Sequence, residues 1–471
     1  MKKNKVIVGL INVLSSNLTV MFLGIIISMY LPIRLDIEGY GYFQLYLLYS
    51  GYLGIFMLGI LDGMNLKYSG TEYEDLNKIT INKYFYTTLL ISSIFMFISI
   101  LICIFFISNI NRKIVFIFVS INILLFNING YFSHLNQLSL RFKNYSIGIL
   151  LERLLFVISF IPLILYSKQN YVIYIVINII CRIITLIYNA FTTRDIIKVS
   201  NLNRESLTED VLDSMKVGLP IMFSSFIGML ILGFPRILVE KTFGIEIFAL
   251  FSFSMSILSM GIQVIVAITT VVYPILRKKQ KHIYDQASVT FSNIVTWIGV
   301  LILISYYPIY MIIQIYIPKY SGILQYLHLL IPLMIFQCKN NIVINTFYKV
   351  LRFESILIKN NIKGFLLCCI STTLSLCIYK DIKVMIIFFV LSYALWVILS
   401  LNKIIKLANW KMKRYEYLDF IIILVFIILN STQAILYSGI LFILFLILCI
   451  PFLMKVYIQD VKFIKEFCCN L

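Results

Sequence analysis

The residues that could carry chemistry in this chain are cations placed within or at the ends of long apolar runs. Arg182 and Lys339 fall near the middle of two such runs, and Arg34 and Arg236 lie at the ends of two others. A charge inside a bilayer is costly to hold, so it usually faces a cavity or a partner and not lipid. Several cations around one hollow would give it a positive potential. We therefore predict that these four residues form a cationic surface that binds an anion.

Amide and hydroxyl side chains are also gathered in particular runs. In the first run, Asn12, Ser15, Ser16 and Thr19 recur at the spacing of one helix face. Two later runs, 114–138 and 322–348, are unusually polar. A wetted cavity wall is one interpretation, and helix–helix packing through small polar groups is the other. The residues predicted to line the cavity are Asn12, Ser16, Thr19, Asn129, His134, Asn341 and Asn345.

Two carboxylates are candidates for coupling to a proton or a sodium ion, Asp62 at the end of the second run and Glu152 at the start of the fifth. The alternatives are a plain interfacial aspartate and, for Glu152 with Arg153, a pair that anchors a helix end. The sequence contains no Ser-His-Asp spacing, no Gly-rich phosphate loop and no His/Cys cluster. We therefore expect no catalytic residue, no cofactor and no metal site, in a protein that is not an enzyme.

The elements that must position these residues are membrane-spanning helices. Of the 471 residues, 61% are hydrophobic and only 13% are charged, and the mean hydropathy is +0.95. Charges cluster between runs of about 20 apolar residues, the length that crosses the hydrocarbon core. The fold class expected is all-α and polytopic, with about fourteen spans, or twelve as the next choice. The spans are expected near 9–31, 40–62, 84–108, 114–138, 146–167, 171–192, 215–235, 244–273, 289–316, 322–348, 356–379, 384–402, 418–437 and 439–457.

The net charge of +19 is explained by membrane orientation. If the N-terminus is cytoplasmic, the cytoplasmic segments hold most of the 40 Lys and Arg residues, as the positive-inside rule requires. Both termini are then predicted to be cytoplasmic. No basic soluble domain accompanies the charge, so we expect no nucleic-acid partner.

An internal duplication organises the spans. Pro32 and Pro235 recur at the same offset as Gly41 and Gly244, and Leu-Arg-Phe at 140–142 returns at 351–353. These echoes indicate two parallel six-helix lobes, 1–200 and 201–410, followed by two accessory helices and a cytoplasmic tail in 411–471. Parallel repeats of this kind occur in transporter folds and enclose a central site.

Three short stretches resemble a known family, namely Leu31-Pro32-Ile33-Arg34 continuing through Glu38-Gly39-Tyr40-Gly41-Tyr42-Phe43, Leu58 to Gly63, and Leu140 to Tyr145. They are similar to bacterial oligosaccharide-lipid flippases of the Wzx type, in the superfamily that also holds multidrug and toxin extrusion pumps. The resemblance implies a bacterial plasma-membrane protein working by alternating access. Its substrate would be an isoprenoid-diphosphate-linked oligosaccharide, moved to the outer leaflet for surface polysaccharide such as O-antigen or capsule.

Other functions compete with this one. A multidrug exporter would need an intramembrane carboxylate, whereas the buried charge here is mainly basic. A polysaccharide polymerase would need a long extracytoplasmic loop, and the sequence has none. A transporter of lipid-linked peptidoglycan precursor is a further alternative, and it is similar to the oligosaccharide-lipid flippase. The partners expected are the lipid-linked oligosaccharide, membrane lipids, a proton or sodium counter-ion, and polymerase and chain-length proteins, with the chain itself a monomer.

Overall fold

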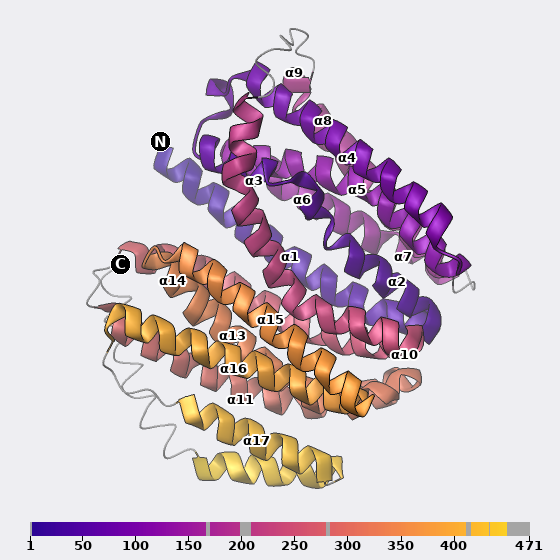
Figure 1. Cartoon of the computed structure of the whole chain (residues 1–471), viewed down its shortest axis with the longest axis vertical. Helices are drawn as coiled ribbons and strands as arrows, with labels where there is room; N and C mark the ends of the chain where they lie inside the picture. The colour runs from indigo at the N-terminus through magenta and orange to yellow at the C-terminus, as the bar shows by residue number, and fades with distance from the viewer. Residues whose placement is uncertain are drawn as a thin grey trace. The chain divides into compact units, whose positions relative to one another are not determined.

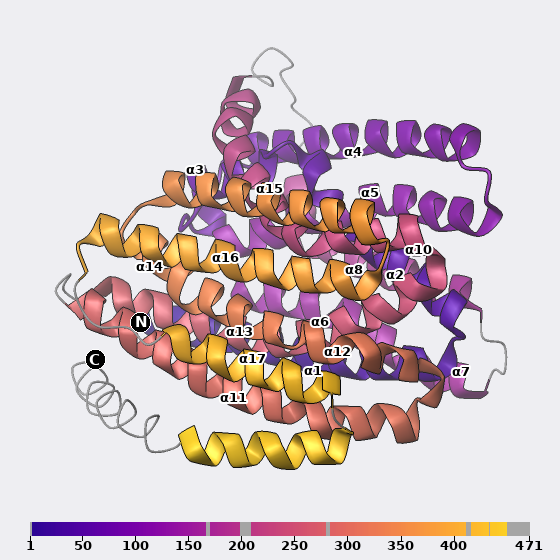
Figure 2. The same cartoon turned by 60° about the horizontal axis from the view of Figure 1, so that its bottom comes forward.

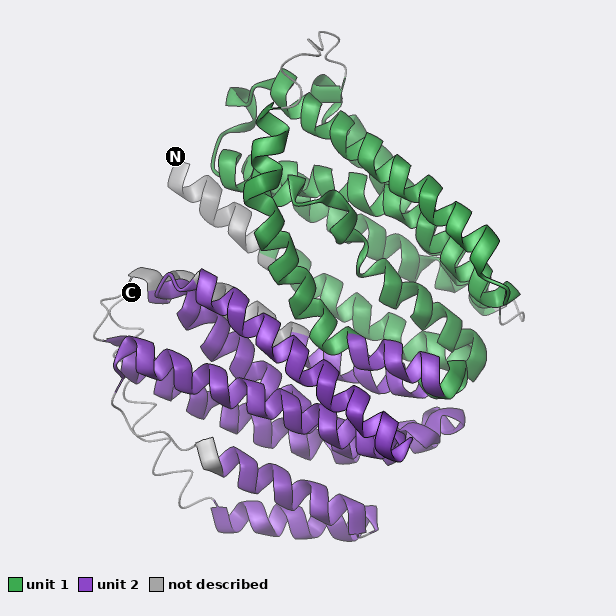
Figure 3. Ribbon diagram, in the orientation of Figure 1, with its two compact units in different colours: residues 1–233, 243–249 green, residues 234–242, 250–471 purple. Residues whose placement is uncertain are grey.

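The computed structural model describes residues 2–165, 170–197, 209–278, 283–410, 416–432 and 434–449. Throughout these ranges every regular element is helical (Figure 1), which confirms the predicted all-α class. The chain divides into two compact units, residues 1–233 with 243–249, and residues 234–242 with 250–471 (Figure 3). These units do not test the division into lobes 1–200 and 201–410 that the sequence repeat predicts, so that division stays a prediction.

Unit 1 is a bundle in which α4 packs against α5, α1 against α6, and α8 against both α5 and α6. Its helices are α1 (Lys2–Arg34), α2 (Ile37–Ser50), α3 (Ile60–Tyr68), α4 (Lys78–Phe106), α5 (Ile110–Leu138), α6 (Phe142–Ile158), α7 (Phe160–Leu165), α8 (Tyr171–Thr192), α9 (Arg194–Ile197) and the first part of α10 (Glu209–Lys278).

Asp and Asn side chains fix where several of these helices begin. Asp36, Asn77, Asn109 and Asn170 accept hydrogen bonds from backbone N–H groups in the first turns of α2, α4, α5 and α8. Such caps satisfy donors that have no partner inside the helix, and each stabilises a helix by about 1 kcal/mol. Asp381 does the same for α16.

Unit 2 holds the remaining helices, and here α15 packs against α16 while α13 packs against α11 and α16. Figure 2 shows α17 alongside α11. The helices are the rest of α10, α11 (Tyr284–Tyr316), α12 (Leu324–Leu330), α13 (Pro332–Lys339), a π-helical segment (Asn340–Asn345), α14 (Thr346–Val350), α15 (Glu354–Tyr379), α16 (Ile382–Ala408), α17 (Glu416–Thr432) and a last helix (Ile435–Cys449).

The 70 residues of α10 cannot be a single span. A straight helix of that length would reach about 105 Å, more than three times the thickness of the hydrocarbon core. Gly244 interrupts the helix with φ +83 and ψ −178, a conformation open to glycine because it has no Cβ. The break falls at the first residue of the predicted span 244–273, a few residues after the predicted span 215–235.

The surface of the helices is apolar, as a bilayer requires. On α4, Phe97, Phe105 and Phe106 are exposed by 62%, 75% and 80%, and burying such area in lipid removes the penalty of exposing it to water. Nine helices of the described residues are long and apolar enough to cross a membrane, or eleven if two bent pairs each count once. The chain is therefore a multi-pass membrane protein, and the count of fourteen spans stays a prediction.

Small residues let α3 approach the start of α10 closely. Gly59 and Gly63 on one side face Ser214 and Gly218 on the other, and a Cβ on Gly63 or Gly218 would collide with the carbonyl of Ser214 or Gly59. Small residues four apart are the usual means of bringing membrane helices together. An ion pair between Lys67 and Asp210, 2.7 Å apart, lies in the same contact.

Gly218→Ala is expected to destabilise the protein by about 1–3 kcal/mol, because the added methyl group overpacks a backbone contact. The matched control is Gly228→Ala in the same helix, where the new methyl group meets nothing within 4 Å. The measurement is the thermal unfolding midpoint of each purified variant. Equal midpoints for the two variants would show that this contact contributes little.

A polar cluster joins α9 to α4 and to the short turn Tyr73–Asp75 before it. The Asp195 carboxylate accepts a hydrogen bond from the Tyr73 hydroxyl at 2.7 Å and pairs with the Lys78 ammonium at 2.8 Å. Asn82 donates to the Ile196 carbonyl at 2.6 Å. Burial alone raises the pKa of Asp195, but the bonds from Lys78 and Tyr73 outweigh it, so the pKa lies below its usual value.

This shift predicts the pH at which the cluster loosens. A carboxyl with a lowered folded-state pKa stabilises the fold above its unfolded pKa of about 3.9, and the contribution disappears as the pH falls through the folded value. Hydrogen exchange at Ile196 and Ile197, corrected for the intrinsic rate, should therefore accelerate below about pH 4. Asp195→Asn should show fast exchange at neutral pH, while Asp213→Asn, in a pair that is about 70% exposed, should not. Unchanged exchange in Asp195→Asn would contradict the assignment.

Candidate functional site

An ion pair stands at the centre of a polar network in unit 1. Arg182 on α8 donates from Nε to Glu152 Oε1 on α6 at 3.0 Å, and from an Nη to Asn122 Oδ1 on α5 at 2.5 Å. The side chains of Arg182 and Glu152 are only 12% and 22% exposed. The guanidinium also lies 5.5 Å from the centre of the Phe126 ring. Three helices therefore hold the cation in one orientation.

Amides carry the network outward from the ion pair. Asn122 donates to the Ser50 hydroxyl on α2 at 3.0 Å, and Asn129 donates to the Arg182 carbonyl and accepts from Asn189. Each of these side chains is buried. Most buried amides in proteins are hydrogen-bonded, and here the bonds of Asn122 and Asn129, two of the polar residues in span 114–138, join helices to one another.

A second buried ion pair lies in unit 2. Lys339 at the end of α13 pairs with Asp419 on α17, with side chains only 4% and 2% exposed. The other oxygen of Asp419 accepts a hydrogen bond of 2.5 Å from the Thr296 hydroxyl on α11. Asp419 is absent from the residues predicted from the sequence. It is the second residue of the predicted span 418–437, and an acid in that position is typical of a helix end at the membrane interface.

The helix changes its winding directly after Lys339. Residues 340–345 are π-helical, and the Thr346 hydroxyl donates to the Asn341 carbonyl while Asn345 donates to Asn341 Oδ1. Both amide atoms of Gln337 and Oδ1 of Asn340 are buried without a partner among the described residues. Single π turns are common at functional sites, since they widen the helix and redirect side chains.

The other predicted residues lie apart from these clusters. Arg34 donates to the Ile164 carbonyl of α7 at 3.4 Å, and Arg236 donates to the Ser252 hydroxyl at 3.4 Å. Asp62 is half-buried in α3, and His134 lies 2.8 Å from the Asn65 amide. On α1, Asn12 is half-buried, Ser16 is buried, and Thr19 is exposed with its hydroxyl bonded to the Ser15 carbonyl.

The structure thus brings together Arg182, Glu152 and Asn129 in unit 1, and Lys339, Asn341 and Asn345 in unit 2. Both central cations have a carboxylate partner, so neither cluster carries a net positive charge by itself. An anion would have to compete with Glu152 or Asp419 for the cation. Within the residues that the structure describes, no three His, Cys, Asp or Glu side chains are grouped as a metal site would require. The cationic surface stays a prediction.

Comparison with known proteins places the sequence in a family. The family model described as polysaccharide biosynthesis protein matches residues 7–280, more than half of the chain. The chain belongs to this family. The match spans unit 1 and reaches into unit 2, and it includes Arg34, Arg182 and Arg236. A comparison with curated protein sequences yielded no match.

Solved structures share the fold of this polysaccharide biosynthesis protein at low sequence identity. The lipid II flippase MurJ in an inward closed conformation has a TM-score of 0.59 and 13% identity over 97% of this chain and all of that one. An inward-facing multidrug resistance MATE family transporter of the MOP superfamily has a TM-score of 0.61 and 12% identity over 85% and 100%. A MOP superfamily transporter from Pyrococcus furiosus has a TM-score of 0.55 and 11% identity over 87% and 97%. At such identities the likeness concerns the fold.

Proposed function

We propose that this member of the polysaccharide biosynthesis protein family is a flippase. Its substrate would be an isoprenoid-diphosphate-linked oligosaccharide, moved from the cytoplasmic to the outer leaflet of a bacterial plasma membrane. The observation that carries the proposal is the Arg182–Glu152 pair, whose side chains are largely shielded, at 12% and 22% exposed, in the unit that the family match covers. Both chain ends would be cytoplasmic, and the chain would act as a monomer that supplies a polymerase and chain-length proteins.

The pair suits a diphosphate because the Arg182 guanidinium is held in one orientation and has more N–H donors than Glu152 and Asn122 bind. A guanidinium has five N–H donors in a planar fork that matches phosphate oxygens. Glu152 and Asn122 take two of them. A diphosphate that displaced Glu152 would leave that carboxylate to take a proton from water, which couples substrate binding to proton binding. Asp62 is the second candidate for coupling, to H⁺ or Na⁺.

The membrane potential could drive the movement without ATP. An inside-negative potential favours outward transfer of an anion by about 2.3 kcal/mol per charge for each 100 mV. Proton uptake on Glu152 as the substrate binds would cancel one negative charge of the moving complex and reduce this bias. The size of the dependence of export on the potential would therefore distinguish transfer of the anion alone from transfer together with a proton.

A deletion strain tests the proposal. It should accumulate lipid-linked repeat units on the cytoplasmic face and lose surface glycan, with both restored by a plasmid copy. Normal surface glycan after a clean deletion, in a strain without a second copy, would overturn the function.

The same strain separates the alternatives. The fold is shared with a MATE family transporter and with a lipid II flippase. Increased drug susceptibility with normal glycan would identify an exporter. Cell lysis with accumulation of peptidoglycan precursor would identify a lipid II carrier.

A further inference from the structure

Three lysines converge at one end of unit 2, where α15 begins and α16 ends. Lys359 and Lys363 lie one turn apart on α15 and are exposed, and Lys403 lies half-buried on α16, which packs against α15. Both lysines of α15 are close enough to act electrostatically on Lys403. Three positive charges therefore repel one another at one place on the surface.

Lys403 is held in this position by a buried amide. Its Nζ donates to Asn360 Oδ1 at 2.9 Å, and Asn360 is only 5% exposed. The other groups of Asn360 are also bonded, since Nδ2 donates to the Tyr348 hydroxyl at 2.8 Å and the carbonyl accepts from Trp396 Nε1 at 2.9 Å. An ammonium has three N–H donors, so the bond to Asn360 leaves two of them for a ligand.

The three lysines differ from other cations because no carboxylate lies within ion-pair distance of them among the side chains that the structure describes. Cations elsewhere do pair with carboxylates, namely Lys67, Lys78, Arg182, Lys216 and Lys339. Bringing like charges together costs free energy, and a bound anion would remove that cost.

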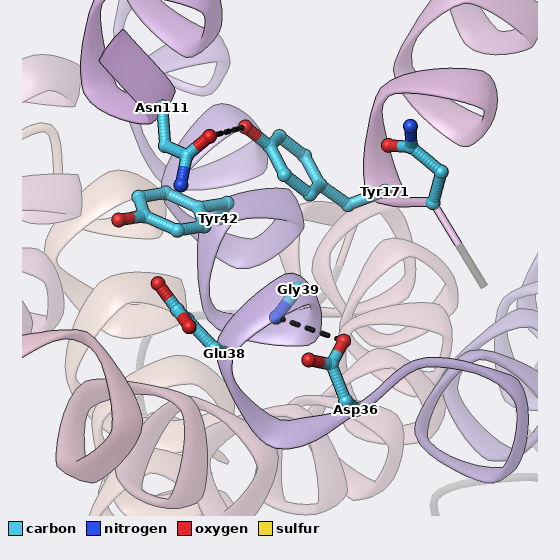
Figure 4. A pocket seen from close by; sticks show the side chains of 7 residues that line it. Asp36, Glu38, Gly39, Tyr42, Asn111 and Tyr171 are labelled. Atoms are coloured by element: carbon cyan, nitrogen blue, oxygen red, sulfur yellow. Dashed lines mark hydrogen bonds between the residues drawn. The ribbon is translucent and has the colours of Figure 1, made fainter.

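The pocket of unit 1 shows no such excess of one charge. Figure 4 shows it where α2, α5 and α8 begin, with the Tyr171 hydroxyl donating to Asn111 Oδ1 at 3.1 Å. Its two carboxylates, Asp36 and Glu38, lie beside helix N-termini with partial positive charge. The lysine cluster is therefore the stronger candidate for a site that attracts an ion.

Two exposed apolar strips run from the lysines toward the middle of the two helices. Their members are 47% to 62% exposed and recur every four residues, namely Leu366, Ile370 and Leu374 on α15 and Leu391, Leu395 and Leu399 on α16. The first strip continues the face of Lys363, and the second leads to the turn before Lys403. Cations above two apolar strips match a lipid with a charged head and two chains.

Phosphate is the anion that this arrangement favours. Lysine binds phosphate as a point charge, and basic sites between membrane helices at the bilayer surface bind the head groups of anionic lipids. Free phosphate would use the lysines but leave the strips uncovered. An isoprenoid diphosphate has one chain and would cover one strip, whereas a phospholipid covers both.

We propose that the α15–α16 face of unit 2 binds an anionic phospholipid. Its phosphate lies among Lys359, Lys363 and Lys403, and its two acyl chains lie along the strips. This lipid is a resident of the membrane and not the transported substrate, so the proposal does not depend on the proposed function. The predicted topology puts the site in the cytoplasmic leaflet.

Trp396 is a reporter for this site, because it lies about 10 Å along α16 from Lys403 on the side of the strips. The chain has three tryptophans, so Trp297→Phe with Trp410→Phe leaves Trp396 alone. The full-length protein is placed in phosphatidylcholine nanodiscs that contain phosphatidylglycerol or phosphatidylcholine with brominated chains, at equal mole fraction. Brominated phosphatidylglycerol should quench Trp396 at a several-fold lower mole fraction, and added sodium chloride should reduce the preference.

Lysine variants test whether the cluster causes the preference. Lys363→Gln and Lys403→Gln should each weaken it about fivefold, the effect expected of one cation near a membrane surface. The matched control is Lys383→Gln, exposed at the other end of α16, which should leave it unchanged. Equal quenching by the two lipids, or the same preference in all three variants, would overturn the proposal.

Asn360→Asp tests the site without removing a cation. The new carboxylate has the shape of the amide and would pair with the Lys403 ammonium, so the preference for phosphatidylglycerol should fall. Unchanged preference in this variant would contradict the role given to Lys403. If Lys403→Gln fails to fold, Lys363→Gln still tests the cluster, because Lys363 is exposed.

Competitors without bromine identify the source of the phosphate. Phosphatidylglycerol should relieve the quenching of Trp396. Relief by inorganic phosphate at constant ionic strength would show that the head group alone is bound. Relief by undecaprenyl diphosphate and not by phosphatidylglycerol would assign the face to the substrate lipid. Either of these two results would overturn the proposal of a resident phospholipid.

Discussion

Lys339→Ala is expected to lower the stability of the protein by about 3–5 kcal/mol, because it leaves the Asp419 carboxylate buried without its counter-charge. Asp419 is 2% exposed, so water cannot replace the lost ammonium. The loss should appear as a large drop in the thermal unfolding midpoint of the purified protein and in its amount in the membrane. Because Asp419 is on α17, the accessory helices are expected to detach first, which hydrogen exchange in α17 would reveal.

The double variant Lys339→Met with Asp419→Leu separates stability from transport. Removing both charges of a buried pair is often neutral or stabilising, so the midpoint should return close to that of wild type. Lys216→Ala breaks a pair whose side chains are 76% and 70% exposed and should change little. Loss of export in the stable double variant would place Lys339 in transport. Normal export would make the pair purely structural, and a Lys339→Ala midpoint equal to wild type would contradict the whole argument.

Arg182→Ala is expected to reduce export by about tenfold to a hundredfold at equal protein level, since a charge-assisted hydrogen bond contributes about 1.5–3 kcal/mol. Arg182→Lys should recover only part of this. A lysine keeps the charge but cannot bridge Glu152 and Asn122 with one planar fork. The measurement is surface glycan per unit of membrane-inserted protein in the complemented deletion strain.

Arg153→Ala is the matched control for Arg182. Arg153 is adjacent to Glu152 but exposed, so its loss should leave export unchanged. Arg182→Ala with Glu152→Ala removes the orphaned carboxylate and should recover stability. If export stays low in that stable variant, the guanidinium itself serves the substrate. Full export in Arg182→Ala would eliminate the cation from the proposed function.

The sequence was most informative where a charged residue falls inside an apolar run. Arg182 and Lys339 stand out because a cation in an apolar run is rare and costly, and both are central to the clusters found. Their partners were not predictable, because periodicity assigns a residue to a helix face but not to a neighbouring helix. Glu152 was weighed as an ion carrier and Asp419 passed unnoticed, although each is the counter-charge of one of these cations.

The contacts between helices could not be predicted either, because periodicity does not show which helix a face packs against. Gly59 and Gly63 lie in a stretch that resembles the flippase family, yet their use depends on Ser214 and Gly218, about 150 residues further along the chain. The change to π-helical winding after Lys339 leaves no mark in hydrophobic patterning, because apolar residues recur at nearly the same spacing in both kinds of turn. The Asn-rich spans stand out in the sequence, which allows either a wetted cavity wall or helix packing. The hydrogen bonds of Asn122 and Asn129 show that these two amides join helices, and the cavity wall stays a prediction.

The Ser214–Gly218 face of α10 restricts how this architecture can recombine. It belongs to unit 1 by packing, although it follows residue 200, where the predicted first lobe ends. Relatives that exchanged halves at the predicted lobe boundary near residue 200 would place a foreign helix against Gly59 and Gly63, where even one methyl group has no room. Viable crossovers should therefore fall after Gly233, so that Gly59 and Gly63 stay in one segment with the Ser214–Gly218 face that packs against them.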